Sequence, residues 1–302
     1  MPTIDKSSRL FAITESLLVA LIWASSFVFV KVGLNYIGPL TMAGLRYFGA
    51  FVVLLPFVVR NGKTSPPISP RLWIRLFVIG LSAYTIGNGA LFWGLTYLPA
   101  TTGSFLMSVS PLLILFAGIL WLQEIPTLWQ VFGVIISLIG SGLFFSKGLQ
   151  AGEPLGVLII SIGLIGFALF GILGRAVARD KQLDTLSLTA IPLAIGGGML
   201  LLIALPIEGL PTFTWTAWVI VLWLAIVNTA FAYILYNHSL QVLSALEMNI
   251  MLNLSPLGTA LLAWLFLNES LSIIQIVGMI TVIIGVILVQ QARGRLAKAT
   301  AG

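Results

Sequence analysis

The sequence predicts an all-α membrane protein of ten transmembrane helices, arranged as two inverted five-helix repeats. Three observations lead to this fold class. Of the 302 residues, 59% are hydrophobic and only 8% are charged, and the mean hydropathy is +1.10. The apolar residues form runs of roughly 20, the length that a helix needs to cross the hydrocarbon core of a bilayer. The two halves of the chain also share a pattern of polar, glycine and proline positions.

Ten apolar runs account for most of the chain. They lie at about residues 11–34, 40–59, 72–96, 102–122, 128–146, 155–174, 186–206, 214–237, 246–267 and 272–291. Turn and breaker residues separate them, at Gly38-Pro39, Ser65–Pro70, Pro99, Pro126, Gly152–Pro154, Gly209–Pro211 and Asn268. The first run follows Lys6 and Arg9, as in a signal peptide, but it continues unbroken to Leu34 and therefore predicts a retained helix.

The second half of the chain repeats the first. A single shift along the sequence superimposes Ser110-Pro111-Leu112 on Ser255-Pro256-Leu257, Glu124 on Glu269, Gln130 on Gln275 and Gly140 on Gly285, without a gap. We therefore expect two domains, at residues 1–149 and 150–302. Because five helices is an odd number, the halves must insert with opposite orientations, as they do in many secondary transporters. A gene duplication without functional symmetry is the alternative interpretation.

The basic residues indicate how the chain lies in the membrane. With the N-terminus in the cytoplasm, most Lys and Arg residues of the connections lie on that side, and only Lys147 lies in an outer connection. This bias predicts a multi-pass protein of the cytoplasmic (inner) membrane with both termini inside, which an even number of helices requires. The net charge of +6 then reflects topology and not nucleic-acid binding.

Missing residue types exclude several kinds of site. The absence of cysteine excludes disulfides, thiolate nucleophiles and cysteine-based metal centres, and His238 is the single histidine. The nine acidic residues are spread too thinly for a membrane-embedded transferase, and no segment resembles a nucleotide-binding loop. We therefore expect no enzyme activity, no cofactor and no metal.

A family resemblance rests on a motif that occurs in both halves. It is a Ser-Pro pair followed, at the same distance in each half, by Glu, seen in SPLLILFAGILWLQE and again in SPLGTALLAWLFLNE. With WASSF beginning at Trp23 and with Arg46 in the second run, the chain resembles the drug/metabolite transporter superfamily, specifically its ten-helix permeases with two EamA domains. The resemblance implies a transporter, and members of this kind include exporters of aromatic amino acids of the YddG type.

One position departs from the smaller members of that superfamily. Four-helix multidrug transporters carry a glutamate in their first helix, eight residues before a lysine, that binds drug and proton alternately. In this chain the residue eight before Lys31 is Trp23. Proton coupling through this position is therefore not carried over.

The repeated Ser-Pro helices hold the most specific signal for a binding site. Ser104, Ser108 and Pro111 share one helical face, and the shift between the halves maps them to Asn249, Asn253 and Pro256. The four polar residues are expected to bind substrate, because polar groups inside a bilayer are costly and tend to be functional. The prolines are expected to act as hinges, because each removes a backbone donor and bends its helix. Interhelical hydrogen bonding is the alternative role.

Aromatic and amide side chains extend this predicted site. Tyr84 and Asn88 in the third run, and Asn228 and Tyr233 in the eighth, are expected to provide polar anchors on an aromatic wall. Further substrate-binding candidates are Trp23 and Ser26 in the first run and Phe167 in the sixth.

Charged residues near the helix ends have separate interpretations. For Arg46, about 9 Å into its helix, we favour snorkelling to the headgroups over the alternative of an anion anchor at the outer mouth. Glu124 is expected to be a boundary residue that pairs with the other half, and Glu15 or Glu247 is a candidate proton site. His238 is expected to be solvated at a helix end, and the glycines of the fifth and tenth runs are expected to pack helices closely.

These features predict a secondary transporter that exports small amphipathic metabolites, most specifically amino acids including aromatic ones, by alternating access. A multidrug or other metabolite exporter is the alternative, and an integral-membrane enzyme or a channel fits less well, since a channel favours a continuous polar ring. The expected partners are a small-molecule substrate and membrane lipids, with no nucleic acid, and the chain is expected to be a monomer or a homodimer.

Overall fold

The computed structural model describes residues 6–62, 68–98, 103, 106–146, 153–181, 183–211, 214–267 and 272–299. Across these residues all regular structure is helical, and no strand occurs. The described helices include seven that are long and apolar enough to cross a membrane. Two shorter apolar helical segments, Ser110–Leu122 and Leu128–Phe144, accompany them. The all-helical membrane architecture predicted from hydropathy is therefore confirmed.

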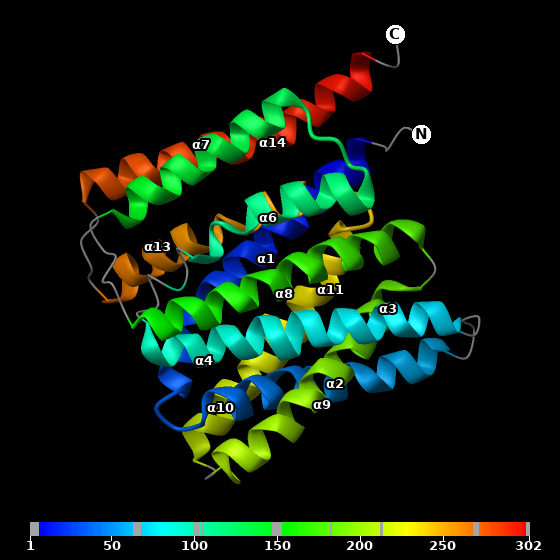
Figure 1. Cartoon of the computed structure of the whole chain (residues 1–302), viewed down its shortest axis with the longest axis vertical. Coiled ribbons are helices and arrows are strands. Elements are labelled where there is room, and N and C mark those ends of the chain that lie inside the picture. The colour runs from blue at the N-terminus through cyan, green and yellow to red at the C-terminus, as the bar shows by residue number, and fades with distance from the viewer. Residues whose placement is uncertain are drawn as a thin grey trace.

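Figure 1 shows the helices as they follow one another along the chain. They are α1 (Lys6–Gly33), α2 (Pro39–Gly62), α3 (Pro70–Gly80), η1 (Leu81–Asn88), α4 (Gly89–Tyr97), α6 (Ser110–Ala117), η2 (Gly118–Leu122), α7 (Leu128–Phe145), α8 (Pro154–Asp180), α9 (Thr185–Glu208), α10 (Trp215–Ala225), η3 (Ile226–Phe231), α11 (Ala232–Ser239), α12 (Ala245–Leu252), α13 (Ser255–Leu267) and α14 (Ile273–Ala299). The elements named η are π-helical segments. Of these, η1 and η3 each lie between two α-helical segments, and η2 ends the helix that begins with α6.

Side-chain caps explain where several helices begin. The hydroxyl of Ser69 accepts from the backbone N–H of Leu72 at the start of α3, and Asp184 caps α9 in the same way. Thr127 and Ser244 open α7 and α12 with capping boxes, in which a side chain three residues later returns a hydrogen bond. Such caps satisfy backbone donors that have no partner within the helix, which matters most where lipid replaces water.

Several local features recur at the interval of the sequence repeat. The π-helical turns η1 and η3 begin at Leu81 and Ile226, two positions that the shift between the halves superimposes. The helices α6 and α13 begin at Ser110 and Ser255, which the same shift superimposes, and a proline follows directly in each. The sequence repeat therefore extends to details of backbone geometry.

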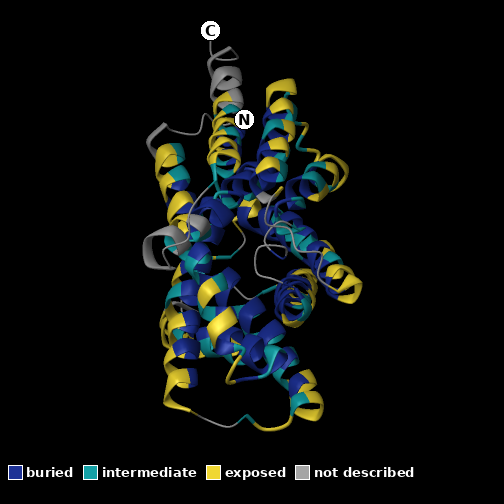
Figure 2. Ribbon diagram, turned by 90° about the vertical axis from the view of Figure 1, so that its left-hand side faces the viewer, coloured by how far each residue is buried: buried dark blue, intermediate teal, exposed yellow. Residues whose placement is uncertain are grey.

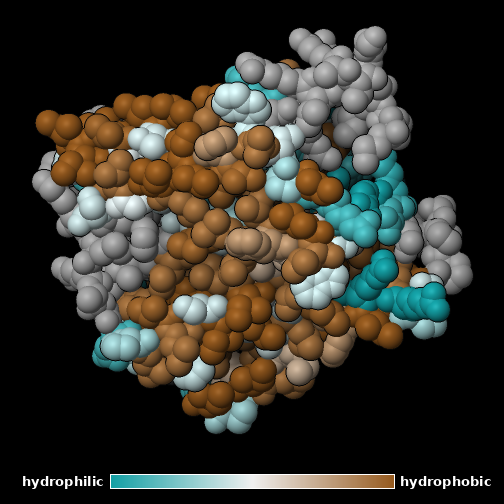
Figure 3. Space-filling model, turned by 45° about the horizontal axis from the view of Figure 1, so that its top comes forward, coloured by the Kyte–Doolittle hydropathy of each residue, from teal (hydrophilic) through white to brown (hydrophobic). Residues whose placement is uncertain are grey.

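The surface of the bundle is apolar, as a lipid-facing surface must be. Buried residues line the inside of the helices and exposed residues point outward (Figure 2). Many of the exposed side chains are large and hydrophobic, for example Leu21, Phe57 and Phe116, which are 61%, 59% and 63% exposed. Most described residues on the face shown in Figure 3 are hydrophobic, and the largest group of hydrophilic residues lies toward the right-hand side. An apolar surface of this extent marks contact with lipid and not with water.

Helices α7 and α14 pack against each other along their length, at the top of Figure 1. Glycines make this approach close. A Cβ atom on Gly140 would lie 2.8 Å from the carbonyl oxygen of Gly278, and one on Gly133 would lie 2.8 Å from that of Gly285. The prediction of close packing is confirmed for these four glycines, and the contact joins residues from the two halves of the chain. It is wrong for Gly142 in the same run, where a Cβ would have nothing within 4 Å.

Candidate functional site

A cavity of about 140 Å³ lies between helices from both halves of the chain. Its wall is mostly apolar, with a few polar side chains, as in many small-molecule sites. The predicted site residues that line it are Trp23, Ser26, Arg46, Asn88, Ser108, Phe167, Tyr233, Asn249, Asn253 and Pro256. Residues far apart in the sequence thus converge on one space.

Aromatic rings form one side of the cavity. The Trp23 ring centroid lies 5.0 Å from that of Tyr233 and 5.7 Å from that of Tyr236, and Tyr236 stacks on Phe170 at 5.1 Å. The indole N–H of Trp23 donates to the backbone oxygen of Asn228 at 3.1 Å, which holds the ring against the wall. Sequence reasoning missed Tyr236 as a site residue, although it lies one helical turn beyond Tyr233.

The two Ser-Pro helices meet at the cavity. The side-chain amide of Asn253 donates to the backbone oxygen of Ser108 at 3.2 Å, and the hydroxyl of Ser110 donates to the side-chain oxygen of Asn249 at 3.0 Å. The helix between Ala245 and Leu267 is interrupted at Asn253 and Leu254, directly before the Ser255-Pro256 pair. The polar stripes therefore face each other beside a break in the helix.

Three of the predicted residues lie away from the cavity wall. Tyr84 is buried behind it, with its ring 4.9 Å from that of Tyr47. Asn228 is fully buried and uses its amide to join helices, since Nδ2 donates to the backbone oxygen of Ile22 at 2.6 Å. Pro111 stands in the first turn of α6, outside the lining. Ser104 lies outside the described residues.

Arg46 is placed differently from our favoured interpretation, and the snorkelling prediction is wrong. Only 4% of the residue is exposed. Its guanidinium donates to the Ser26 hydroxyl and to the Thr229 hydroxyl, both at 2.7 Å, and to the backbone oxygen of Asn228 at 3.1 Å. These acceptors lie on α1 and η3, so the side chain points into the bundle instead of toward a headgroup layer.

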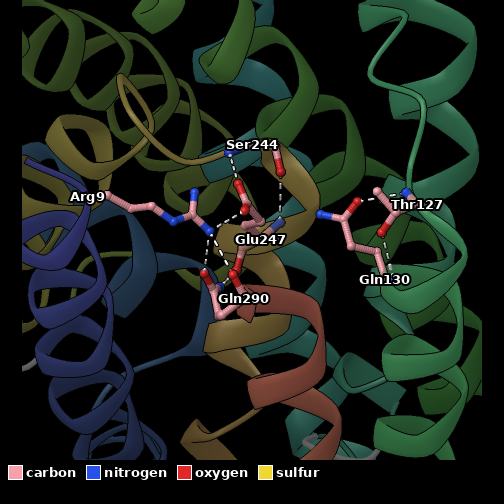
Figure 4. A network of polar contacts seen from close by, with 6 residues as sticks. All are labelled: Arg9, Thr127, Gln130, Ser244, Glu247 and Gln290. Atoms are coloured by element: carbon pink, nitrogen blue, oxygen red, sulfur yellow. Dashed lines mark hydrogen bonds and ion pairs between the residues drawn. The ribbon is translucent and has the colours of Figure 1, made fainter. Parts of the chain in front are cut away.

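Ion pairs join the two halves near the end of the molecule where α1 begins. Arg9 pairs with the fully buried Glu247 at 2.7 Å and also donates to the backbone oxygen of Gln290 at 3.0 Å (Figure 4). Arg175 pairs with Glu124 at 3.0 Å, which confirms that Glu124 pairs with the other half. Along α1, Arg9 lies about 20 Å before Trp23 at 1.5 Å per residue, so this pairing occurs well to one side of the cavity.

His238 has a partner as well as solvent. Its side chain is 44% exposed, and Nδ1 shares a hydrogen bond with the carboxylate of Glu15 at 2.8 Å. The hydroxyl of Ser239 donates to the same carboxylate oxygen at 3.1 Å. The expectation of a purely solvated histidine is therefore incomplete, because sequence position could not show that Glu15 lies beside it.

A second hollow of about 390 Å³ lies beside the Arg175–Glu124 pair. Ile125 forms part of its wall and is 84% exposed, and the described wall carries no cluster of aromatic rings. The cavity with the aromatic wall is lined by buried and half-buried side chains such as Ser108 and Tyr233, and it gathers most of the predicted site residues. We therefore take the aromatic cavity as the candidate site.

Comparison with known proteins agrees with these features. A sequence model of the EamA-like transporter family matches residues 10–146 and again residues 154–290. An uncharacterized transporter of Archaeoglobus fulgidus is 29% identical over 279 residues, which are 90% of this chain and 94% of that protein. The uncharacterized inner membrane transporter YedA of Escherichia coli is 30% identical over 159 residues, about half of each chain. A crystal structure shares the fold with a TM-score of 0.78 at 16% identity, over 94% of this chain and 98% of its own.

Proposed function

Because the chain belongs to the EamA-like transporter family, we propose that it is a secondary transporter which exports small amphipathic metabolites across the cytoplasmic membrane, aromatic amino acids above all. The observation that supports this most directly is the aromatic cavity, which combines aromatic rings with a few polar side chains from both halves. An aromatic amino acid offers the same combination of an apolar ring and polar groups. Transport by a multi-pass membrane protein without a nucleotide-binding loop would use solute or ion gradients.

We further propose that residues 1–149 and 150–302 form two inverted five-helix repeats. The equivalent positions of the π-helical turns and of the Ser-Pro helices support this arrangement. Two cations that bond to equivalent helix ends also support the arrangement. Lys31 donates to the backbone oxygen of Leu95 at 2.9 Å, and Arg175 donates to that of Leu240, on which the shift superimposes Leu95. Inverted repeats allow each half to adopt the conformation of the other, which reverses the side on which a shared cavity opens.

Alternating access would then depend on the ion pairs at the beginning of α1. In the conformation described here they join the halves at that end, and the cavity lies along the later part of α1, from Trp23 to Val30. Opening the cavity toward the end of the molecule where α1 begins would require Arg9 and Glu247 to separate. Because Glu247 is fully buried, separation must expose its carboxylate to water or provide another partner.

Flux measurements in proteoliposomes test the proposed function. Purified protein is reconstituted, and uptake of labelled phenylalanine, tryptophan, a nucleoside and a cationic drug is compared with that of protein-free liposomes, with and without a pH gradient. We expect saturable flux of the amino acids. Saturable flux of the cationic drug alone would overturn the amino acid proposal in favour of a multidrug exporter, and no saturable flux of any solute would overturn the proposed transport activity toward this panel.

A further inference from the structure

Arg46 is a buried cation for which the described residues provide only neutral acceptors. Its three hydrogen bonds go to two hydroxyls and one backbone oxygen, on Ser26, Thr229 and Asn228. Within the part of the chain that the structure describes, no carboxylate lies within ion-pair distance of it. A charge at membrane depth without a counter-charge is costly, and such residues generally serve a function.

The guanidinium has donors left for a ligand. It carries five N–H groups, and the three hydrogen bonds use one on Nε and one on each terminal nitrogen. One N–H on each terminal nitrogen therefore has no described partner. Arg46 lines the cavity, and its Cζ lies 5.1 Å from the Tyr47 ring centroid and 5.8 Å from that of Phe92. A planar guanidinium held by its neighbours, with an N–H left on each terminal nitrogen, can donate to the two oxygens of a carboxylate.

The rest of the described cavity wall adds no compensating charge. Among the lining residues that the structure describes, Arg46 is the one charged side chain, and the others are apolar, aromatic, hydroxyl or amide groups. The acidic residues nearest in sequence to lining residues are engaged elsewhere, since Glu247 pairs with Arg9 and Glu15 bonds to His238. The described cavity thus has a formal charge of +1.

From this geometry we propose that the cavity selects solutes that carry a carboxylate and rejects net cations, with Arg46 as the anion anchor. The inference rests on the proposed transport function and narrows its substrate class. The carboxylate would bind at Arg46, and the apolar body of the solute would lie against Trp23 and Phe170. An ammonium group is not required but is tolerated, because Asn253 donates through Nδ2 to Ser108 and keeps its amide oxygen as an acceptor.

Three probes that share one phenyl group and differ in charge test this inference. They are phenylalanine (a zwitterion), 3-phenylpropanoate (an anion) and phenethylamine (a cation). Each is measured as a competitor of labelled phenylalanine flux in proteoliposomes and as a stabiliser of the purified protein against thermal unfolding. For the wild type we expect phenylalanine and 3-phenylpropanoate to bind at least about tenfold more tightly than phenethylamine. The carboxylate of the first two pairs with the buried Arg46 guanidinium, whereas the amine brings a second positive charge beside it.

Variants of Arg46 and of one of its acceptors provide the matched comparison. Arg46→Gln should abolish the preference for carboxylates in the thermal assay, and Arg46→Lys should restore part of it. Thr229→Val removes one acceptor of the guanidinium and keeps the charge, so it should retain the preference. If Arg46→Gln does not fold, the inference is tested by the order in which the three probes stabilise the wild type and Arg46→Lys. A weaker preference for carboxylates in Arg46→Lys than in the wild type supports it, and the same preference in both contradicts it.

The outcomes separate this inference from the proposed function. Flux of phenylalanine with equal competition by phenethylamine would overturn the anion inference and leave transport intact. A carboxylate preference that persists in Arg46→Gln would overturn the role of Arg46. Thermal stabilisation by carboxylates alone, without flux of any probe, would support the inference and overturn the proposed function. No stabilisation by any of the three probes would overturn the inference.

Discussion

Trp23 shows how a single side chain can serve both the fold and the site. Its indole N–H donates to the backbone of Asn228, and its ring lies against Tyr233 and Tyr236. The sequence departs here from the four-helix multidrug transporters, which carry a glutamate eight residues before the lysine. A neutral ring with one donor cannot exchange a proton there, so Trp23 shapes the cavity without offering a site for ion coupling.

We expect the ring of Trp23 to contribute more to binding than its hydrogen bond. Trp23→Phe keeps an aromatic wall and loses a hydrogen bond of about 1 kcal/mol, so the Kd for phenylalanine should rise no more than about fivefold. Trp23→Ala also removes the ring contacts and leaves a void, so its Kd should rise well over tenfold. Equilibrium binding of phenylalanine to the purified variants measures both Kd values. An equal rise in Kd for the two substitutions would contradict the larger contribution of the ring.

The polar residues of the Ser-Pro helices provide a second prediction at this scale. Ser108→Ala combined with Asn253→Ala removes two polar side chains from the cavity wall, including the Asn253 amide that bonds to the Ser108 backbone. We expect the KM for saturable flux to rise about tenfold or more, because each lost polar contact weakens binding by about 1 kcal/mol. Flux in proteoliposomes that is unchanged by the double substitution would show that these residues do not form the site.

Among the elements, the pair α7 and α14 depends on glycine for its close approach. A Cβ on Gly140 would lie 2.6 Å from the backbone nitrogen of Val282, whereas one on Gly142 would have nothing within 4 Å. The same helix thus holds one glycine in close contact and one with open space beside it. Because backbone atoms cannot move aside as a flexible side chain can, a larger residue at Gly140 would have to shift a helix.

We therefore expect Gly140→Ala to destabilise the protein by about 1–3 kcal/mol through overpacking. Gly142→Ala is the matched control, and it should be neutral or stabilising by up to about 1 kcal/mol, because alanine favours the helix. Thermal unfolding of both purified variants in the same detergent measures the difference. Equal melting temperatures would show that α7 and α14 are not held at the separation described here.

At the scale of the whole molecule, the orientation of the chain follows from the distribution of Lys and Arg and can be measured directly. The protein has no cysteine, so a maleimide would label only the single cysteine that is introduced. Tyr36 and Arg71 are both exposed and lie in or next to connections on opposite sides of the predicted topology. We expect a membrane-impermeant maleimide to label Tyr36→Cys in intact cells and Arg71→Cys only after permeabilisation. The reverse pattern would contradict the predicted topology.

The ion pair between Arg9 and Glu247 provides a test of alternating access. Glu247→Gln keeps the size of the side chain and removes its charge, which leaves Arg9 without its buried partner. In inside-out vesicles, a cysteine at the cavity residue Met107 should then react several-fold faster with an impermeant maleimide. Asp180→Asn is the control, because Asp180 meets Arg75 and Arg179 at 3.8 Å with both partners partly exposed, and such pairs contribute little. Unchanged reactivity in Glu247→Gln would contradict a role in closing that end.

The sequence by itself determined the helical membrane class and the family, because both depend on local properties. A spanning helix satisfies its backbone internally and needs only length and hydropathy, which the apolar runs show directly. The Ser-Pro motif and its repeat are likewise read along the chain. Most of the polar residues of the predicted site line the cavity for a related reason, since polar groups in apolar helices are costly unless they face the interior.

Only the tertiary structure decided the partners of the charged and amide side chains. The spacing of Arg46 from its helix end indicated its depth but not its direction, and its acceptors on Asn228 and Thr229 lie in the other half of the chain. For the same reason the sequence could not show that Asn228 joins helices instead of lining the cavity, or that Glu15 lies beside His238. Helix depth is a property of one segment, whereas a hydrogen bond depends on how two segments pack.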